Sequence, residues 1–216
     1  MNHKIEERFQ NVSKSKTFGN IVHLFNLNKK AVLDAGCSYG EFLIHFGDGS
    51  EGITLDKAEA EYTRSKGLSV HLDNVESQTL KLNKTFDVVF ANNLLEHLYS
   101  PHEFLIKTKE YLKPDGTLIL GVPCIPTITP LIQIKKFRGS MAGGHINFFT
   151  RRTLIETVKR AGWKIQTVRG FHFRNPVIDL PLNPIYPHFY VIATPDPNFE
   201  YPEKRKKELA GYKNTS

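Results

Sequence analysis

Short apolar segments alternate with helical patterns along most of the chain, and this alternation restricts the fold more than any other feature. The four clearest segments are nearly continuous apolar runs, at 31–34, 52–56, 86–91 and 117–122. Such runs are typical of strands covered on both faces of a parallel sheet. Helical patterns follow the first three of them, at 41–46, 57–66 and 101–112. The sequence therefore predicts an α/β fold with a doubly wound sheet and right-handed crossovers.

Capping and turn residues support these boundaries. Ser100 and Pro101 are typical of the N-cap and first position of the helix at 101–112. Gly67 is typical of the residue that follows a helix end. The segment 113–116 predicts a turn, because its proline presets φ and its glycine accepts a positive φ.

The pattern changes in the C-terminal third. Thr150 is expected to cap a helix at 151–161 that Gly162 ends. Strands are expected at 163–168 and 188–194, joined by an ordered loop at 171–187. Because no crossover helix joins them, an antiparallel pair at the sheet edge is favoured.

Three parts of the chain are expected. Residues 1–28 predict a helical cap that could cover a site, and residues 29–195 form the main domain. Residues 196–216 form a basic, flexible tail.

The composition narrows the class of protein. The 216 residues carry a formal net charge of +7, which fits an anionic partner or simply a basic surface. Two distant cysteines exclude a disulfide-stapled scaffold, and the charged N-terminus is unlike a signal peptide, so a cytoplasmic location is expected. The uncharged stretch 116–134 contains three prolines, which argues against a transmembrane helix. A loop that contacts an apolar substrate or a membrane surface stays open.

Acidic residues and glycines follow the first two predicted strands. Asp34 precedes a loop with Gly36 and Gly40, and Asp56 ends the second strand. In doubly wound sheets, ligands bind outside the carboxyl ends of the strands, and an acid at the second strand can accept ribose hydroxyls. The plainer alternatives are a tight strand–helix turn for the loop and a helix N-cap for Asp56. The glycine spacing departs from the dinucleotide fingerprint.

Taken together, these motifs resemble a class I S-adenosylmethionine (SAM)-dependent methyltransferase, of the small-molecule group that includes the ubiquinone O-methyltransferases. The motifs that carry the resemblance span most of the chain, at 34–40, Asp56, 72–75, 86–98, 112–118 and 143–150. Cys37 and Ser38 stand where many members have a second glycine. The resemblance implies a seven-stranded sheet in the order 3-2-1-4-5-7-6, with the last strand antiparallel.

The resemblance also implies roles for particular residues toward S-adenosyl-L-methionine. Asp34 would help to hold the methionyl ammonium, and the loop after it would face the methionyl portion. Asp56 would bind the ribose, Asp73 the adenine amine, and Asn92 would offer backbone contact near the sulfonium. The full expected cofactor-binding set is Asp34, Gly36, Cys37, Tyr39, Gly40, Asp56, Asp73, Asn74 and Asn92.

Two histidines are candidate general bases for an oxygen acceptor, because imidazole titrates nearest neutral pH. His145 lies in a segment that resembles the family's Gly-His-x-x-x-Phe-Thr motif, and His97 follows the fourth-strand motif. Alternatively, His145 braces the start of a helix and His97 bonds a loop. Methyl transfer from a sulfonium requires no metal, and none is expected.

The acceptor is expected to be a small molecule, with O-methylation favoured. Basic residues between 135 and 169 would suit a phosphorylated, sugar-nucleotide or lipid-linked acceptor, or form a solvated face: Lys135, Lys136, Arg138, Arg151, Arg152, Lys159, Arg160, Lys164 and Arg169. Asn92–Leu95 lacks the Pro-Pro loop of base amino-methyltransferases, so nucleic acid is disfavoured. A nicotinamide-dependent oxidoreductase and a noncatalytic SAM-binding protein are the alternatives.

Overall fold

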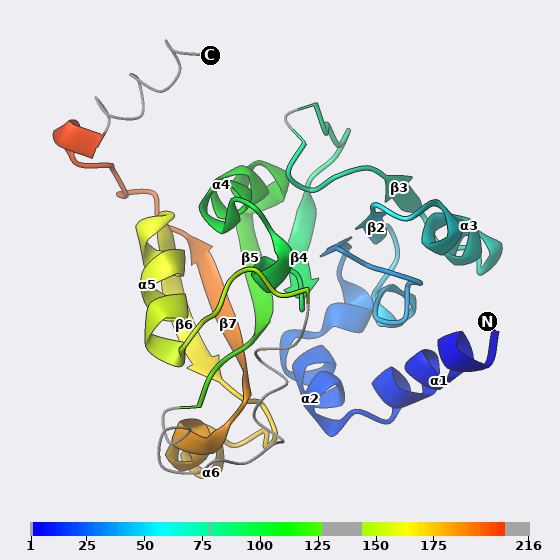
Figure 1. Ribbon diagram of the computed structural model, residues 1–216, viewed down its shortest axis with the longest axis horizontal. Coiled ribbons are helices and arrows are strands. Elements are labelled where there is room, and N and C mark those ends of the chain that lie inside the picture. Colours follow the sequence, from blue (N-terminus) through cyan, green and yellow to red (C-terminus); the bar gives the residue numbers. More distant parts are fainter. Residues whose placement is uncertain (1, 78, 127–143, 206–216) are drawn as a thin grey trace.

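The computed structural model describes residues 2–77, 79–126 and 144–205 and contains one seven-stranded sheet in these ranges (Figure 1). The strand order is β3-β2-β1-β4-β5-β7-β6. β1 to β5 pair in parallel, and β7 runs antiparallel to both β5 and β6. The strands are β1 (Val32–Ala35), β2 (Glu51–Thr54), β3 (Val70–Leu72), β4 (Phe86–Asn92), β5 (Leu112–Pro123), β6 (Trp163–Arg169) and β7 (His188–Pro195). This order and the antiparallel strand confirm the predicted fold.

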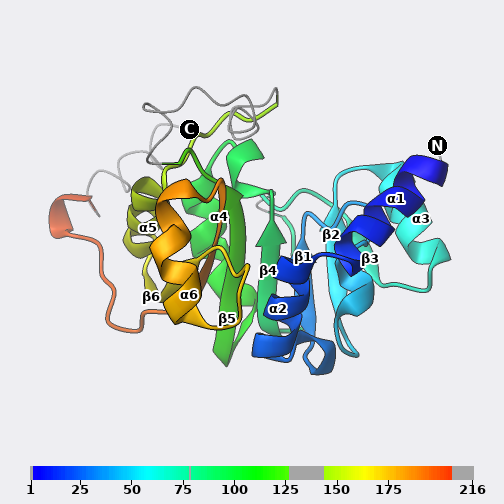
Figure 2. The same ribbon diagram turned by 90° about the horizontal axis from the view of Figure 1, so that it is seen from below.

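Helices cover both faces of the sheet. The α-helices are α1 (Asn2–Ser13), α2 (Lys16–Phe25), α3 (Lys57–Ser65), α4 (Pro101–Lys107), α5 (Arg151–Arg160) and α6 (Pro176–Asp179). Phe104 and Leu105 of α4 pack with Leu154 and Val158 of α5 on one face. On the opposite face, α2 packs against β1, β4 and β5 in a second cluster (Figures 1 and 2). The central strands are thus buried on both sides, as their continuous apolar runs predict.

The turn predicted at residues 113–116 is wrong. These residues belong to the long strand β5, and the register with β4 shifts between Phe86 and Val88 to accommodate them. Gly116 does not have a positive φ. A Cβ at Gly116 would lie 2.8 Å from Cδ2 of Leu112, so glycine permits close packing here rather than an unusual φ.

The helix predicted at residues 41–46 is also wrong, because the structure has only the 3₁₀ turn η2 (Leu43–His45) there. Just after this turn, Gly47 packs against the backbone of Lys30, where a Cβ would lie 2.6 Å from the Lys30 nitrogen. The backbone N–H of Gly47 also donates to Leu27.

Two further element predictions need correction. The helix expected at 101–112 is α4 followed by the 3₁₀ segment η4 (Thr108–Tyr111), and the Ser100 side chain makes no capping hydrogen bond. The loop expected at 171–187 contains α6 and the 3₁₀ segment η6 (Leu180–Ile185). Asn175 caps α6 by accepting from the N–H of Val177.

The N-terminal prediction of helices is confirmed by α1 and α2. α1 lies beside α3, where Glu6 accepts a hydrogen bond from the Tyr62 hydroxyl (Figure 2). At the other end, the expected tail begins with an anchored segment, since the Tyr201 hydroxyl lies 2.6 Å from Nε2 of His102. The rest of the basic run at 204–207, beyond Arg205, lies outside the described residues.

Part of the uncharged stretch at 116–134 lies outside the described residues too, as do Lys135, Lys136 and Arg138. Within the described ranges, no helix combines the length and apolar character needed to cross a membrane.

Candidate functional site

The loop after β1 contains three residues with positive φ, a backbone conformation that residues other than glycine seldom adopt. Gly36 and Gly40 have φ of 77° and 84°, and Ser38 between them has φ of 48°. The N–H groups of Gly36 and Cys37 both donate to the carbonyl of Ile53, which ties the loop to β2. The loop therefore presents backbone at the carboxyl ends of β1 and β2, where a ligand can approach closely.

Two buried carboxylates lie beneath this loop. Asp34 is 2% exposed and Glu41 is 4% exposed. Oδ2 of Asp34 and Oε2 of Glu41 have no hydrogen-bond partner among the described residues. Burial, reinforced by the charge of Glu41, raises the pKa of Asp34 well above its usual range. A cationic ligand group placed here would pair with these two oxygens.

The N-terminal helix α1 supplies the cation that Glu41 already has. Nε and Nη2 of Arg8 donate to Oε1 of Glu41 at 3.0 and 2.6 Å. The same guanidinium lies 5.4 Å from the ring centroid of Tyr39. Arg8 thus links α1 to the loop after β1. The role of residues 1–28 as a cap over a site stays a prediction.

Asp56 is the N-cap of α3, which is the alternative to ribose binding considered for this residue. Its Oδ1 accepts from the N–H groups of Ala58 and Glu59 at 2.7 and 3.0 Å. No hydrogen bond to its Oδ2 is found in the described ranges, and the residue is exposed, so capping leaves one oxygen for a ligand. Glu59 braces the site by accepting from Ser38 and Thr54.

Asp73, Asn74 and Cys37 differ in which of their groups a ligand can reach. Asp73 and Asn74 are half-buried in a turn after β3, where Oδ1 of Asp73 accepts from the N–H of Asn74. Cys37 is 1% exposed, with its thiol packed toward Gly52, so only its backbone faces the loop side. Burial raises the pKa of the Cys37 thiol, which makes it unreactive.

The end of β4 carries a second group of polar side chains. Oδ1 of Asn92 is buried without a hydrogen-bond partner among the described residues. It lies over Gly121 of β5, where any side chain would collide with it. The neighbouring Asn93 has φ of 53°, and its Oδ1 lies 3.0 Å from Nε2 of His188.

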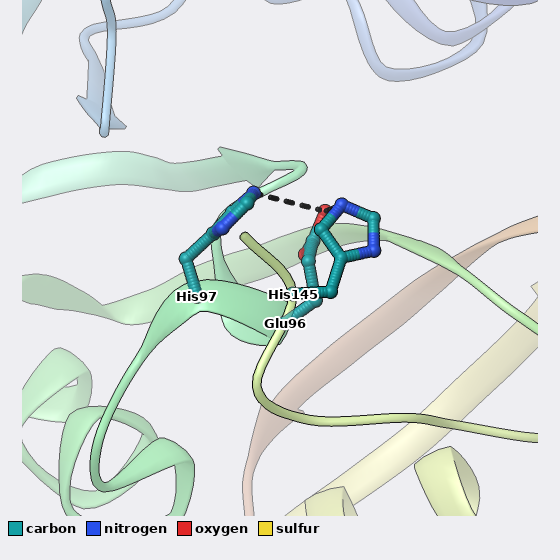
Figure 3. A group of neighbouring side chains, drawn as sticks. All are labelled: Glu96, His97 and His145. Carbon is teal, nitrogen blue, oxygen red and sulfur yellow. Dashed lines mark ion pairs between the residues drawn. The ribbon is translucent and has the colours of Figure 1, made fainter. Parts of the chain in front are cut away.

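The 3₁₀ turn η3 (Leu95–His97) begins three residues beyond Asn92. Its Glu96 lies beside both predicted histidines, His97 and His145 (Figure 3). Oε1 of Glu96 lies 3.9 Å from Nε2 of His97 and 4.0 Å from Nε2 of His145. The two imidazole rings are 4.8 Å apart and nearly perpendicular. Glu96 is 1% exposed, and burial raises the pKa of its carboxyl group.

Comparison with known proteins identifies this arrangement. A family model described as a methyltransferase domain matches residues 4–168. The chain belongs to this methyltransferase family. The enzyme is therefore a SAM-dependent methyltransferase, and the strand order with an antiparallel β7 differs from that of the dinucleotide-binding oxidoreductases. The nicotinamide-dependent alternative is overturned.

Curated relatives of the methyltransferase act on different acceptors. A ubiquinone biosynthesis O-methyltransferase of Haemophilus ducreyi is 34% identical over 169 residues, which cover 69% of this chain and 71% of the relative. A tRNA U34 carboxymethyltransferase of Desulfotalea psychrophila is 31% identical over 50% of this chain and 37% of its own length.

Among solved structures, a SAM-dependent methyltransferase from Clostridium acetobutylicum has a TM-score of 0.67 at 11% identity. The match covers 90% of this chain and 99% of that chain, and it supports the fold.

Two acids were not predicted from the sequence: Glu41, beside Asp34, and Glu96, beside the two histidines. Glu41 directly follows Gly40, and an acid next to a glycine loop could have signalled a cationic ligand. Glu96 was visible only as the neighbour of His97. Its proximity to His145 depends on tertiary structure.

Proposed function

We propose that the methyltransferase binds SAM across the carboxyl ends of β1 to β4 and transfers its methyl group to a hydroxyl of a small molecule. The pair of buried carboxylates Asp34 and Glu41 carries the first half of this proposal, because each has an oxygen without a hydrogen-bond partner in the part of the chain that the structure describes. The aminoacyl ammonium of SAM is a cation that would pair with these two oxygens, while Arg8 keeps the other oxygen of Glu41. Asp56 and Asp73, on neighbouring strand ends, would then bind the ribose and the adenine.

The chemistry of the step supports this division of the site. The donor carries an activated methyl group, so the protein has to hold donor and acceptor in line. The backbone around Asn92 would face the reacting end of the donor. His97 and His145 lie beyond it, where either imidazole could accept the proton of an acceptor hydroxyl.

The small-molecule acceptor is favoured by the relatives. The ubiquinone biosynthesis O-methyltransferase covers most of the chain, whereas the chain spans 37% of the tRNA-modifying relative. A small molecule with a hydroxyl group is therefore the favoured acceptor.

The described basic residues lend little support to an anionic acceptor. Arg151 donates to the carbonyl of Val168, and Arg160 lies 3.7 Å from Glu156. Arg169 lies 3.6 Å from the buried Asp179. These residues serve the fold or a solvated face.

Thermal unfolding of the purified protein tests the donor site. SAM or S-adenosylhomocysteine at about 100 times its dissociation constant should add about 2.7 kcal/mol to the stability. For a domain of this size, the Tm should rise by roughly 5–10 °C. NAD at the same concentration serves as the control and should leave Tm unchanged. A shift with NAD alone would contradict the proposal.

Substitution of Asp56 separates its two roles. Serine is as good an N-cap as aspartate, so Asp56→Ser should change the stability by less than about 0.5 kcal/mol. It cannot supply the carboxylate that would accept both ribose hydroxyls, so SAM affinity should fall about 10-fold or more, as for a lost charged hydrogen bond. Calorimetric titration with SAM measures the change. Unchanged affinity would mean that Asp56 only caps α3.

A further inference from the structure

We propose that Glu96, His97 and His145 bind a divalent transition-metal cation. Each residue offers one ligand atom, and the three atoms lie within 4.8 Å of one another (Figure 3). Ligand atoms around a Zn²⁺ ion at about 2.0–2.2 Å lie roughly 3–3.5 Å apart, so closure requires shifts of about 1 Å or less. Two imidazoles and one carboxylate match ions such as Zn²⁺, Fe²⁺ or Mn²⁺. The sequence alone gave no expectation of a metal.

The burial of Glu96 is the strongest argument for a cation. The residue is 1% exposed, and neither carboxylate oxygen has a hydrogen-bond partner among the described residues. A buried carboxylate without donors is unfavourable unless a cation neutralises it. The groups that face Oε1 are the two imidazole Nε2 atoms, at 3.9 and 4.0 Å, which is too far for hydrogen bonds.

The orientation of His97 supports coordination. Its Nδ1 lies 3.0 Å from the carbonyl oxygen of Gly144, which can only accept, so Nδ1 carries a proton. In the neutral ring, Nε2 then turns a lone pair toward the Glu96 carboxylate. Two electron-rich atoms facing each other favour a cation between them. A backbone carbonyl that fixes the second ring nitrogen is the usual support of a metal-binding histidine.

The third ligand, His145, is held near Glu96 by hydrogen bonds of the residues that follow it. The N–H groups of Ile146 and Asn147 both donate to the carbonyl of Glu96, at 2.9 and 3.0 Å. Nδ2 of Asn147 donates to the carbonyl of Leu98 at 2.6 Å and to that of Leu95 at 3.3 Å. The segment that carries His145 is therefore fastened to η3 on both sides of Glu96.

Three protein ligands leave coordination positions for a substrate oxygen. The His97 side chain is 44% exposed and that of His145 is 13% exposed, so the cluster opens to solvent on the imidazole side. A cation there would lower the pKa of an acceptor hydroxyl, whose proton passes to solvent water. The acceptor oxygen then forms its bond to the methyl carbon, while the electron pair of the carbon–sulfur bond returns to sulfur. With the cation bound, Nε2 of each histidine is a ligand and no longer a base, so the cation takes the place of the imidazole base. This role, unlike cation binding itself, rests on the proposed function.

Titration with CoCl2 tests the site. Protein stripped with a chelator should bind one Co²⁺ and develop a visible absorption band, and ZnCl2 should displace it, in line with general affinity orders. MgCl2 should compete poorly, because Mg²⁺ prefers oxygen ligands. Glu96→Gln keeps the shape of the side chain but removes its charge, and affinity for Co²⁺ should fall at least about 10-fold.

Controls separate loss of metal from loss of fold. His102→Asn changes a histidine that contacts Tyr201 outside the cluster and should bind Co²⁺ like the wild type. Glu96→Gln should bind SAM normally, as measured by calorimetric titration. Equal Co²⁺ binding by wild type and Glu96→Gln, or no saturable binding by the wild type, would overturn the metal site. Absent SAM binding by the wild type would instead overturn the proposed donor site.

Discussion

Replacing Asp34 with asparagine is expected to make the free methyltransferase more stable while removing most of its affinity for SAM. The Asp34 carboxyl is buried beside Glu41, and its pKa is raised well above the usual range. Asparagine fills the same space without a charge. The loss of one charge-assisted interaction should weaken SAM binding by about 10- to 100-fold. The gain in stability should be about 0.5–2 kcal/mol, as for other substitutions that relieve a strained functional site.

The raised pKa of Asp34 also predicts how the stability of the wild-type protein depends on pH. Between the ordinary pKa of an aspartate and the raised pKa of Asp34, the folded protein holds a proton that the unfolded chain has released. The free energy of unfolding therefore decreases as pH rises through this window. The difference in stability between Asp34→Asn and wild type should grow over the same range. Urea unfolding at a series of pH values measures it.

The exposed Asp48, in the turn before β2, provides a matched control. Asp48→Asn should leave both SAM affinity and the pH profile unchanged. A less stable Asp34→Asn variant at neutral pH, or one with normal SAM affinity, would show that Asp34 is a structural acid with a partner of its own.

The second large effect is expected at Asp179, which is fully buried in α6. Its carboxylate accepts from the N–H of Phe171 at 2.9 Å and from the hydroxyl of Tyr186 at 3.0 Å. Nη1 of Arg169, itself 6% exposed, lies 3.6 Å away. Asp179→Ala would leave a buried guanidinium without its counter-ion, at about 3–5 kcal/mol. Calorimetry should show Tm lowered by roughly 6–20 °C.

Phe171 adds to the expected loss, because this fully buried residue has φ of 56°, a conformation that non-glycine residues rarely adopt. The hydrogen bond from its N–H to Asp179 helps to hold it there. Tyr186→Phe removes only one hydrogen bond and should cost about 1 kcal/mol. If Asp179→Ala were no worse than Tyr186→Phe, the ion pair with Arg169 would contribute nothing to stability.

Local sequence signals predicted the strands correctly, because each signal depends on a short stretch of chain. The same kind of signal selected the candidate donor-side acids, which stay a prediction. Asp34 and Asp56 each end a strand, and parallel strands bring their carboxyl ends to one edge. Thr150 and Gly162 likewise bound α5 as predicted. Each of these signals lies within a few residues of the feature it predicts.

The failures have the opposite character. Gly116 resembles a turn glycine, yet its role is to let Leu112 pack closely within β5. The contact of Arg8 with Glu41 spans 33 positions, and no local pattern marks it. The approach of His145 to Glu96 depends on the hydrogen bonds of Asn147 to η3. Packing and long-range pairing are not recorded in short motifs.

The chain on both sides of residues 127–143 is tied to the sheet. The N–H of Cys124 donates to Pro187, and that of Ile125 donates to Phe149, each at 2.8 Å. When both ends of a connecting segment are fixed, doubling its length adds only about 0.6 kcal/mol of closure entropy. The length of this connection can therefore change at little cost to the stability of the sheet that anchors its two ends.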